Sequence, residues 1–264
     1  MLEIKNIYKT FNPGTINEKV ALNGLSLKLN EGDFVTVIGG NGAGKSTMLN
    51  AVAGVWPVDE GQILIDGIDV TKLSEYKRAA YLGRVFQDPM TGTAATMGIE
   101  ENLALAKRRG KARVLRPGIT KAERAEYKEL LKILDLGLED RLTSKVGLLS
   151  GGQRQALTLL MATLQKPKLL LLDEHTAALD PKTASKVLAI TDKIVNRDHL
   201  TTLMITHNMK DAIAHGNRLI MMMNGKIVLD IQGEEKKKLT VKQLLDKFEE
   251  ASGEEFSNDS AILG

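Results

Sequence analysis

The sequence contains no cysteine, and aromatic residues make up only 4% of its 264 positions. Without cysteine the chain can form neither a disulfide framework nor a thiolate metal site, and this composition suits a reducing compartment. No apolar run approaches the roughly 20 residues that a membrane-spanning helix requires. The first residues, Met1 to Lys5, lack the pattern of a secretory signal. We therefore expect a cytosolic protein that reaches any membrane through partners.

A strong excess of either charge is also lacking. The formal net charge is +3, whereas binding to nucleic acid depends on clustered lysine and arginine side chains. We therefore expect no nucleic-acid partner. The remaining composition, with 43% hydrophobic and 26% charged residues, is that of an ordinary globular protein with a sizeable core. A chain of this length forms one large domain or two small ones.

Short apolar runs along the chain indicate a buried sheet. Residues 34–38 form a nearly continuous apolar run that ends at glycines, which is typical of a strand inside a largely parallel sheet. Asn224 and Gly225 indicate a hairpin turn between two further strands. The other expected strands lie at residues 2–4, 25–29, 63–65, 84–86, 169–172, 203–205, 219–223 and 227–229.

Between about residues 88 and 166 the pattern becomes helical. Thr120 and Glu123 form a capping box, and large side chains behind it repeat at helical spacing from Tyr127 to Leu134. We therefore expect a mainly helical subdomain inserted into an α/β core.

The C-terminal region begins with a charge run at residues 234–238 and continues with a second capping box, formed by Thr240 and Gln243. An apolar stripe from Val241 to Phe248, spaced i, i+3, i+4 and i+7, predicts a short amphipathic helix followed by a polar end. This helix either packs on its own domain or acts as a regulatory or partner-binding element.

A glycine-rich run follows the strand expected at residues 34–38. The run reads Gly39-Gly40-Asn41-Gly42-Ala43-Gly44-Lys45-Ser46 and fits the pattern G-x-x-x-x-G-K-[ST] of a phosphate-binding loop. Glycines let backbone N–H groups turn inward around phosphates, and the dipole of the helix expected to follow adds to this attraction. We expect Lys45 to reach the β- and γ-phosphates of ATP and the Ser46 hydroxyl to ligate Mg²⁺. An incidental glycine-rich turn is the alternative interpretation.

Two acids follow directly on a run of leucines. Asp173 and Glu174 come after residues 169–172, and open α/β sheets bind ligands at the carboxyl ends of their strands. We predict that Asp173 holds the Mg²⁺ of the nucleotide, directly or through water, and that Glu174 polarises the attacking water. The alternative is a strand that ends in two solvated acids.

The run Leu149-Ser150-Gly151-Gly152-Gln153 resembles the signature motif of the ABC ATPases, which separates that family from other phosphate-loop enzymes. Ser150 can cap the helix that follows, with Gln153 in the reciprocal position, and two glycines allow close approach to a phosphate. The resemblance implies that this helix faces ATP held by the other subunit. A purely structural capped helix explains Ser150 but not the paired glycines.

The resemblance extends to further positions in the expected order. Phe11 matches the aromatic residue that stacks on adenine, with Tyr8 as the alternative. Gln87 matches the glutamine that meets Mg²⁺ and water and links to the helical subdomain. Asp180 matches the loop that communicates across the dimer, although an aspartate before proline is also a favourable helix start. His207 matches the histidine that contacts the γ-phosphate.

Three groups of site residues follow from the motifs and the resemblance. The expected catalytic residues are Gln87, Glu174 and His207. The expected metal-binding residues are Ser46, Gln87 and Asp173. The residues expected to contact ATP are Phe11, Gly39, Asn41, Gly42, Ala43, Gly44, Lys45, Ser46, Thr47, Ser150, Gly151, Gly152, Gln153 and Asp180.

One position departs from the family pattern, and two segments outside the motifs also stand out. His175 follows Glu174 where most relatives carry proline. It is either a tolerated substitution or an imidazole that makes turnover pH-sensitive. The basic segment 107–116 is either a solvated connector or a contact for anionic lipid headgroups or an acidic permease loop. The polar stretch 12–19 has no assigned role.

The resemblance covers about residues 1–231 and implies an α/β fold. We expect a phosphate-loop NTPase (RecA-like) core with an N-terminal antiparallel β region and an inserted α-helical subdomain. The core would comprise residues 1–87 and 167–231, the helical subdomain residues 88–166, and the C-terminal helix and polar tail residues 232–264. Two such subunits, expected to be identical, would sandwich two ATP molecules, and hydrolysis would reopen the pair.

The implied function is to power a membrane transporter from the cytoplasmic face. The partners would be a second ATPase subunit, integral membrane permease subunits and an extracytoplasmic substrate-binding protein. A single ATPase unit without membrane spans suits a bacterial importer built from separate chains, and the sequence is similar to ATPases of amino-acid-type importers, including those for aromatic or branched-chain substrates. The alternative is a soluble ABC ATPase without a permease, such as an iron–sulfur assembly ATPase. DNA-repair relatives carry long coiled coils or zinc modules, which the sequence lacks.

Overall fold

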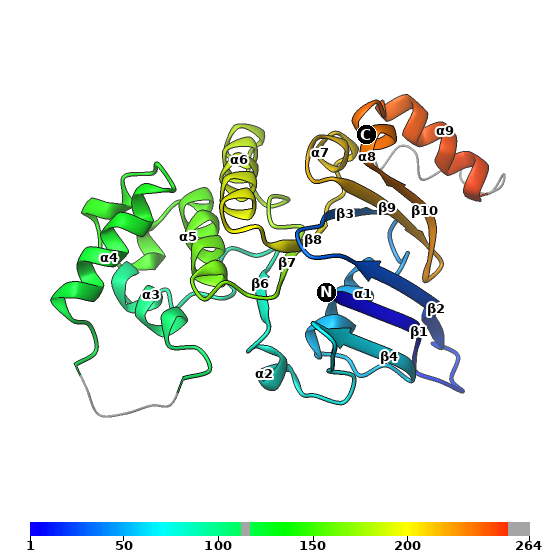
Figure 1. Ribbon diagram of the computed structural model, residues 1–264, viewed down its shortest axis with the longest axis horizontal. Coiled ribbons are helices and arrows are strands. Elements are labelled where there is room, and N and C mark those ends of the chain that lie inside the picture. Colours follow the sequence, from blue (N-terminus) through cyan, green and yellow to red (C-terminus); the bar gives the residue numbers. More distant parts are fainter. Residues whose placement is uncertain (112–116, 253–264) are drawn as a thin grey trace.

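The computed structural model describes residues 1–111 and 117–252. Its strands form two sheets. Figure 1 shows the two sheets next to each other, with helices α3, α4 and α5 gathered at the end of the molecule opposite to the smaller sheet. The fold is therefore the mixed α/β fold that the sequence predicts.

The smaller sheet has four strands in the order β2-β1-β4-β5, with antiparallel neighbours. These strands are β1 (Leu2–Phe11), β2 (Lys19–Leu29), β4 (Glu60–Ile65) and β5 (Ile68–Asp69). Leu2, Ile4 and Ile7 of β1 are buried in the core, and a register shift lies between Ile4 and Ile7. Strands β1 and β2 extend well beyond the short runs that predicted them, because polar residues occupy their outer faces.

The larger sheet has six strands in the order β10-β9-β3-β8-β7-β6. They are β3 (Phe34–Ile38), β6 (Leu82–Val85), β7 (Leu169–Asp173), β8 (Thr201–Ile205), β9 (Arg218–Met223) and β10 (Lys226–Gln232). All neighbours are parallel except β9 and β10, which the Asn224-Gly225 turn joins as a hairpin. The strand expected at 84–86 ends at Val85, so Phe86 and Gln87 lie beyond it.

Helices cover both faces of the larger sheet. Helix α1 (Lys45–Ala53) packs in one apolar cluster with residues of both sheets. Helices α5 (Gly151–Thr163) and α6 (Pro181–Asp198) share a second cluster with the opposite side chains of β7 and β8. The parallel strands are therefore buried on both faces, as their nearly continuous apolar runs predict.

The region between β6 and β7 is mainly helical. It contains α3 (Ile99–Lys107), α4 (Lys121–Lys132), a short turn η2 (Val146–Leu148) and α5. The predicted capping box of α4 is present, since the Thr120 side chain accepts from the Glu123 N–H. Regular helix begins only at Ile99, because residues 86–98 run as turns. Residues 112–116 of the basic segment lie outside the described residues.

The C-terminal helices pack on the core. Helix α8 (Gly233–Lys237) leads to α9 (Val241–Ser252), whose Leu244 and Phe248 are buried with Met209 of α7 (Met209–Ala214). Of the two interpretations of this helix, the structure supports packing on its own domain. Residues 253–264, where the polar end was expected, lie outside the described residues. No helix in the described part of the chain is long and apolar enough to cross a membrane.

Candidate functional site

The glycine-rich loop is wedged between β2 and β9. At Gly39, with φ +150°, a Cβ atom would lie 2.3 Å from the carbonyl oxygen of Met222. At Gly44, with φ +99°, it would lie 2.5 Å from that of Ala21. Both positions therefore require glycine for conformation and for space. The loop is held rigidly at the carboxyl end of β3, directly before the N-terminus of α1.

Lys45 lies inside the loop. Its Nζ donates hydrogen bonds to the carbonyl oxygens of Gly39 and Gly40, at 2.7 and 3.1 Å. Burial lowers the pKa of this ammonium group, while Glu174 and Asp173 act in the opposite direction. An ammonium group held by weak carbonyl acceptors near two acids is well placed to bind a more strongly negative group.

A cavity of about 290 Å³ opens over the loop. Its lining brings together distant parts of the chain: Phe11, Lys19, Ala21, Asn41, Gly42, Ala43, Gly44, Lys45, Ser46, Thr47, Glu174 and His207. Most of these residues were predicted as a nucleotide site. Lys19 and Ala21 were not, because β2 reaches the loop only through tertiary folding. The Lys19 ammonium lies beside Gly42, at the mouth of the loop.

Glu174 and His207 meet at one end of this cavity. The two residues follow β7 and β8, which are adjacent parallel strands and end at the same edge. His207 Nε2 lies 2.5 Å from Glu174 Oε1. Glu174 has a positive φ of 47°, and its N–H donates to the Ile205 carbonyl oxygen at 3.0 Å. A backbone in this uncommon region aims the buried carboxylate into the cavity.

Asp173 lies beside the same edge. Burial and the neighbouring Glu174 raise the pKa of its carboxyl group, while Arg84 and His207 act against that rise. Asp173 and Ser46 offer a carboxylate and a hydroxyl oxygen, donors that Mg²⁺ prefers. The described residues contain no cluster of three or more His, Asp or Glu side chains able to hold a metal ion. The donor set therefore fits a Mg²⁺ ion that takes further oxygen ligands from a bound phosphate.

Phe11 rather than Tyr8 faces the cavity. Phe11 lines its mouth, and the Trp56 ring contacts it edge-on with centroids 5.0 Å apart. The Tyr8 hydroxyl points instead toward Gly24, where a Cβ atom would lie 2.9 Å away. The sequence analysis did not select Trp56, because this residue lies in the segment after α1, which contains none of the motifs.

The signature residues form a well-capped helix start outside this cavity. The Ser150 side chain accepts from the Gln153 N–H at 3.3 Å, and Gln153 Oε1 accepts from the Ser150 N–H at 3.2 Å. A Cβ atom on Gly152 would lie only 2.1 Å from Thr183 Cγ2 of α6. Packing within this chain therefore also requires glycine there, so the paired glycines alone do not establish a phosphate contact.

Asp180 and Gln87 also lie outside the cavity lining. Asp180 caps α6, and its Oδ1 accepts from the Thr183 N–H at 3.1 Å. Gln87 is exposed just beyond β6. Next to it, the Phe86 carbonyl oxygen accepts from Gln155 Nε2 at 2.9 Å. This bond ties the segment after β6 to helix α5.

His175 is turned away from Glu174 into the interior. It is 1% exposed, and its Nε2 lies 3.0 Å from Thr191 Oγ1. The Thr191 hydroxyl donates its one proton to the Val187 carbonyl oxygen. It can therefore only accept from His175, so the ring proton of His175 is on Nε2. Burial, with repulsion from His215, lowers the pKa of His175 to about 4. The imidazole is neutral near neutral pH, which argues against the hypothesis of a titrating switch beside Glu174.

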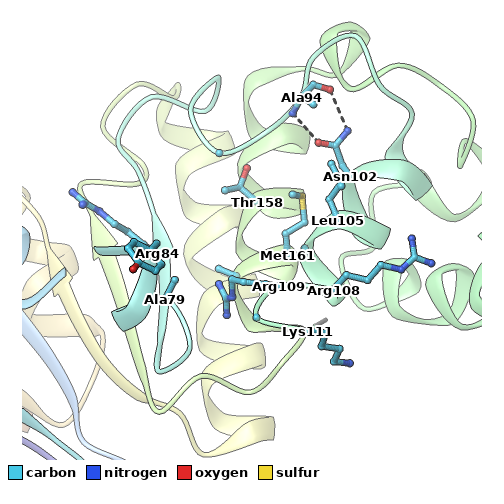
Figure 2. A pocket seen from close by; sticks show the side chains of 15 residues that line it. Ala79, Arg84, Ala94, Asn102, Leu105, Arg108, Arg109, Lys111, Thr158 and Met161 are labelled. Carbon is cyan, nitrogen blue, oxygen red and sulfur yellow. Dashed lines mark hydrogen bonds between the residues drawn. The ribbon is translucent and has the colours of Figure 1, made fainter. Parts of the chain in front are cut away.

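A second cavity, of about 840 Å³, lies between β6 and the helical region. Figure 2 shows Leu105 and Met161 at its wall and the Asn102 side chain bonded to both backbone groups of Ala94. The described part of the basic segment borders it through Arg108, Arg109, Gly110 and Lys111. The groove is thus lined by both apolar and polar side chains, with basic residues of the segment after α3 along one part of it.

Comparisons with known proteins agree on one family. A family model described as ABC transporter matches residues 22–177. A tyrosine transport ATP-binding protein of Clostridioides difficile is 48% identical over 95% of this chain and 100% of its own length. A methionine import ATP-binding protein of Bartonella henselae is 34% identical, over 86% of this chain and 64% of that protein.

Two solved structures have a similar fold. The ATP-binding cassette MJ0796, dimeric in a post-hydrolysis state with ADP and phosphate, superimposes with a TM-score of 0.74 at 31% identity, over 88% of this chain and 98% of that one. The ADP conformation of the cassette MJ1267 superimposes with a TM-score of 0.76 at 27% identity, over 94% and 98% of the two chains.

Proposed function

Because this chain belongs to the ABC transporter family, we propose that it powers the import of an aromatic amino acid, with tyrosine as the first candidate. It is an ATP-binding and ATP-hydrolysing subunit of a membrane transporter of importer type. The observation that carries the substrate proposal is the identity to the tyrosine transport protein, which extends over nearly the whole chain.

The ATPase unit would comprise residues 1–231, with the core at 1–87 and 167–231 and the helical lobe at 88–166. In this unit the cavity over the glycine-rich loop would hold ATP. Phe11 would stack on adenine, and Lys45 would exchange the Gly39 and Gly40 carbonyl oxygens for phosphate oxygens. Backbone N–H groups of residues 41–47 would surround the phosphates.

Ser46 and Asp173 would hold the Mg²⁺ of the nucleotide, with Gln87 as a further ligand. Bound there, the ion neutralises phosphate charge, which phosphoryl transfer requires more than covalent help. Glu174 would orient and polarise the attacking water. His207, in contact with Glu174, would hold that carboxylate and reach the γ-phosphate.

A second copy of the chain would complete each site. Ser150, Gly151, Gly152 and Gln153 lie outside the ATP cavity of their own chain, while the capped start of α5 leaves a helix N-terminus free for an anion. The similar cassette MJ0796 is described as dimeric with ADP and phosphate bound. In such a head-to-tail dimer Asp180, beside the signature helix, would lie at the contact between the subunits.

The 840 Å³ groove would receive a helix of the permease. Its wall includes Leu105, which is 55% exposed, and Met161, so an apolar helix face would bury both. The exposed Lys111 and the partly exposed Arg109 favour acidic side chains on the incoming segment, whereas Arg108 already pairs with Glu123 at 3.1 Å. The groove touches the segment after β6, which the Gln155 bond joins to the signature helix. This arrangement would place the chain at the cytoplasmic face of the membrane, and an extracytoplasmic substrate-binding protein would deliver the amino acid to the permease.

Co-purification from detergent-solubilised native membranes tests the proposal. The tagged Glu174→Gln variant, with ATP present, should retain a polytopic membrane protein in stoichiometric amount. Leu105→Glu in the groove should abolish this retention, whereas Ile68→Glu, at an exposed position on β5, should preserve it. Uptake of labelled tyrosine by cells should fail without the chain. Recovery of soluble partners alone, with the chain absent from the membrane fraction, would instead support a soluble ABC ATPase. Unchanged tyrosine uptake by cells that lack the chain would disprove tyrosine as the substrate.

A further inference from the structure

Arg84 occupies an unusual place between the groove and the ATP cavity. It lies on β6 with a side chain 14% exposed, and it is one of the residues that line the groove. Figure 2 shows its side chain directed away from Leu105 and Met161 on the opposite wall. Nη2 of Arg84 donates to Asn50 Oδ1 at 2.8 Å and to Asp173 Oδ2 at 3.3 Å.

The contacts of Arg84 connect two of the three residues expected to hold Mg²⁺, Asp173 and Ser46. Asp173 is bonded directly. Asn50, one turn along α1, donates from Nδ2 to the Ser46 carbonyl oxygen at 2.8 Å. The ring of Phe86, just beyond the end of β6, lies 4.5 Å from the guanidinium carbon and makes a cation–π contact with it. Three elements, α1, β6 and β7, thus converge on one guanidinium group.

From these contacts we propose that Arg84 is a positioning residue that fixes the Asp173 carboxylate relative to Ser46 for the Mg²⁺ ion of the nucleotide. The inference rests on the proposed function, because it assumes that these two residues hold the ion. Residues that orient metal ligands govern metal affinity almost as strongly as the ligands themselves. This role depends on contacts within the chain, and it does not require Arg84 to contact ATP.

A purely structural role explains the geometry less well. Arg84 Nε is buried and has no hydrogen-bond partner in the part of the chain that the structure describes. An unpaired buried donor is unfavourable, and an apolar side chain at this strand position would avoid it. The arginine therefore serves the two acceptors of Nη2 rather than the packing of the sheet. Lysine would keep the charge, but its ammonium group has a shorter reach and lacks the plane that contacts the Phe86 ring.

The test compares Arg84→Lys and Arg84→Met with Arg218→Lys as the matched control. Arg218 also pairs with an aspartate, Asp230, on the same sheet but far from the nucleotide. Binding of a fluorescent ATP analogue is measured in EDTA and in Mg²⁺, hydrolysis is measured against Mg²⁺ concentration, and the spectrum of bound Mn²⁺ is recorded by electron paramagnetic resonance. Thermal unfolding without nucleotide checks the fold of every variant.

We expect both Arg84 variants to bind the analogue in EDTA as the wild type does. The Mg²⁺ concentration for half-maximal hydrolysis should rise about tenfold or more, and the Mn²⁺ spectrum should change. If Arg84→Met does not fold, Arg84→Lys, which keeps the charge, provides the test on its own. Equal losses of affinity in EDTA and in Mg²⁺, or an unchanged Mg²⁺ requirement and Mn²⁺ spectrum, would overturn the proposal. If the wild type binds no ATP, the proposed function itself fails, and that result is distinguishable from failure of Arg84 alone.

Discussion

The imidazole Nε2 of His207 lies 2.5 Å from the carboxylate Oε1 of Glu174, although 33 positions separate the two residues in the sequence. Adjacent parallel strands β7 and β8 end at the same edge and bring them together. The pair faces the cavity that contains Lys45 and Ser46. The structure therefore supplies an acid–imidazole pair at the place where the terminal phosphate of ATP is expected.

This contact predicts the effect of altering either partner. Glu174→Gln removes the negative charge that would polarise water, and hydrolysis should slow by roughly 10²- to 10⁴-fold. His207→Ala should slow it comparably, because Glu174 loses its orienting contact. Phosphate release measures both effects, and affinity for ATP should persist. His199→Asn, at an exposed helix end with φ +49°, serves as the histidine control. Near-normal turnover in both variants would refute the assignment.

Substitution of Gly152 tests whether the start of α5 needs glycine in order to pack against α6. Gly152→Ala places a methyl group 2.1 Å from Thr183 Cγ2 and should destabilise the protein by about 1–3 kcal/mol. Adding Thr183→Ser removes Cγ2 and should restore stability in denaturant unfolding. If the double variant is stable but hydrolyses ATP poorly, Gly152 also acts on the nucleotide. Failure of the serine to restore stability would show that the clash is not with Thr183.

Trp56 is predicted to support Phe11. Its ring contacts Phe11 edge-on, and loss of an aromatic pair weakens an interaction by about 0.5–1.5 kcal/mol. Trp56→Ala should therefore raise the dissociation constant for ATP by about three- to tenfold, with a smaller effect on the maximal rate. Tyr8→Phe should leave both unchanged, because its hydroxyl points to Gly24. Fluorescent-nucleotide titration measures these constants, and an effect of Tyr8 without one of Trp56 would reverse the assignment.

His175 predicts a loss of stability in acid. In the unfolded chain it protonates near pH 6.5, whereas burial lowers the pKa of the folded group to about 4. Between these values the unfolded chain binds more protons, so stability is present above pH 6.5 and is lost as the pH falls toward 4.

His175→Leu should remove this component, on the order of 2 kcal/mol between pH 6.5 and 4.5. Urea unfolding at a series of pH values measures it. An unaltered slope in His175→Leu would contradict the prediction.

Much of the fold could be predicted because the signals are local. The apolar run at residues 34–38 and the leucines at 169–172 are strands for reasons contained in their own composition. The capping boxes at Thr120 and Thr240 fix helix starts through bonds that span three residues. The sequence analysis underestimated the lengths of β1 and β2, because only the buried face of a half-exposed strand is apolar. The polar residues on the outer faces of these strands therefore gave no strand signal.

The order of the motifs predicted the candidate ATP site, because each motif carries its own chemistry at fixed spacing. Lys19 and Trp56 carried no such signal, and only the packing of β2 and of the segment after α1 brings them to Phe11 and the loop. The sequence also left the choice between Phe11 and Tyr8 open. Side-chain direction in a bulged strand decides it, and that direction depends on the partner strands.

The sequence by itself determined the glycine-rich loop before α1, the acids at the end of β7 and the family, since these depend on residue types at short spacing. Only the tertiary structure decided that His175 is buried and neutral, that Gly152 packs against Thr183, and that Arg84 joins Asn50 to Asp173. Each of these contacts links residues that are far apart in the chain. Their energies come from burial and from distances of a few ångströms, which no pattern in the sequence records.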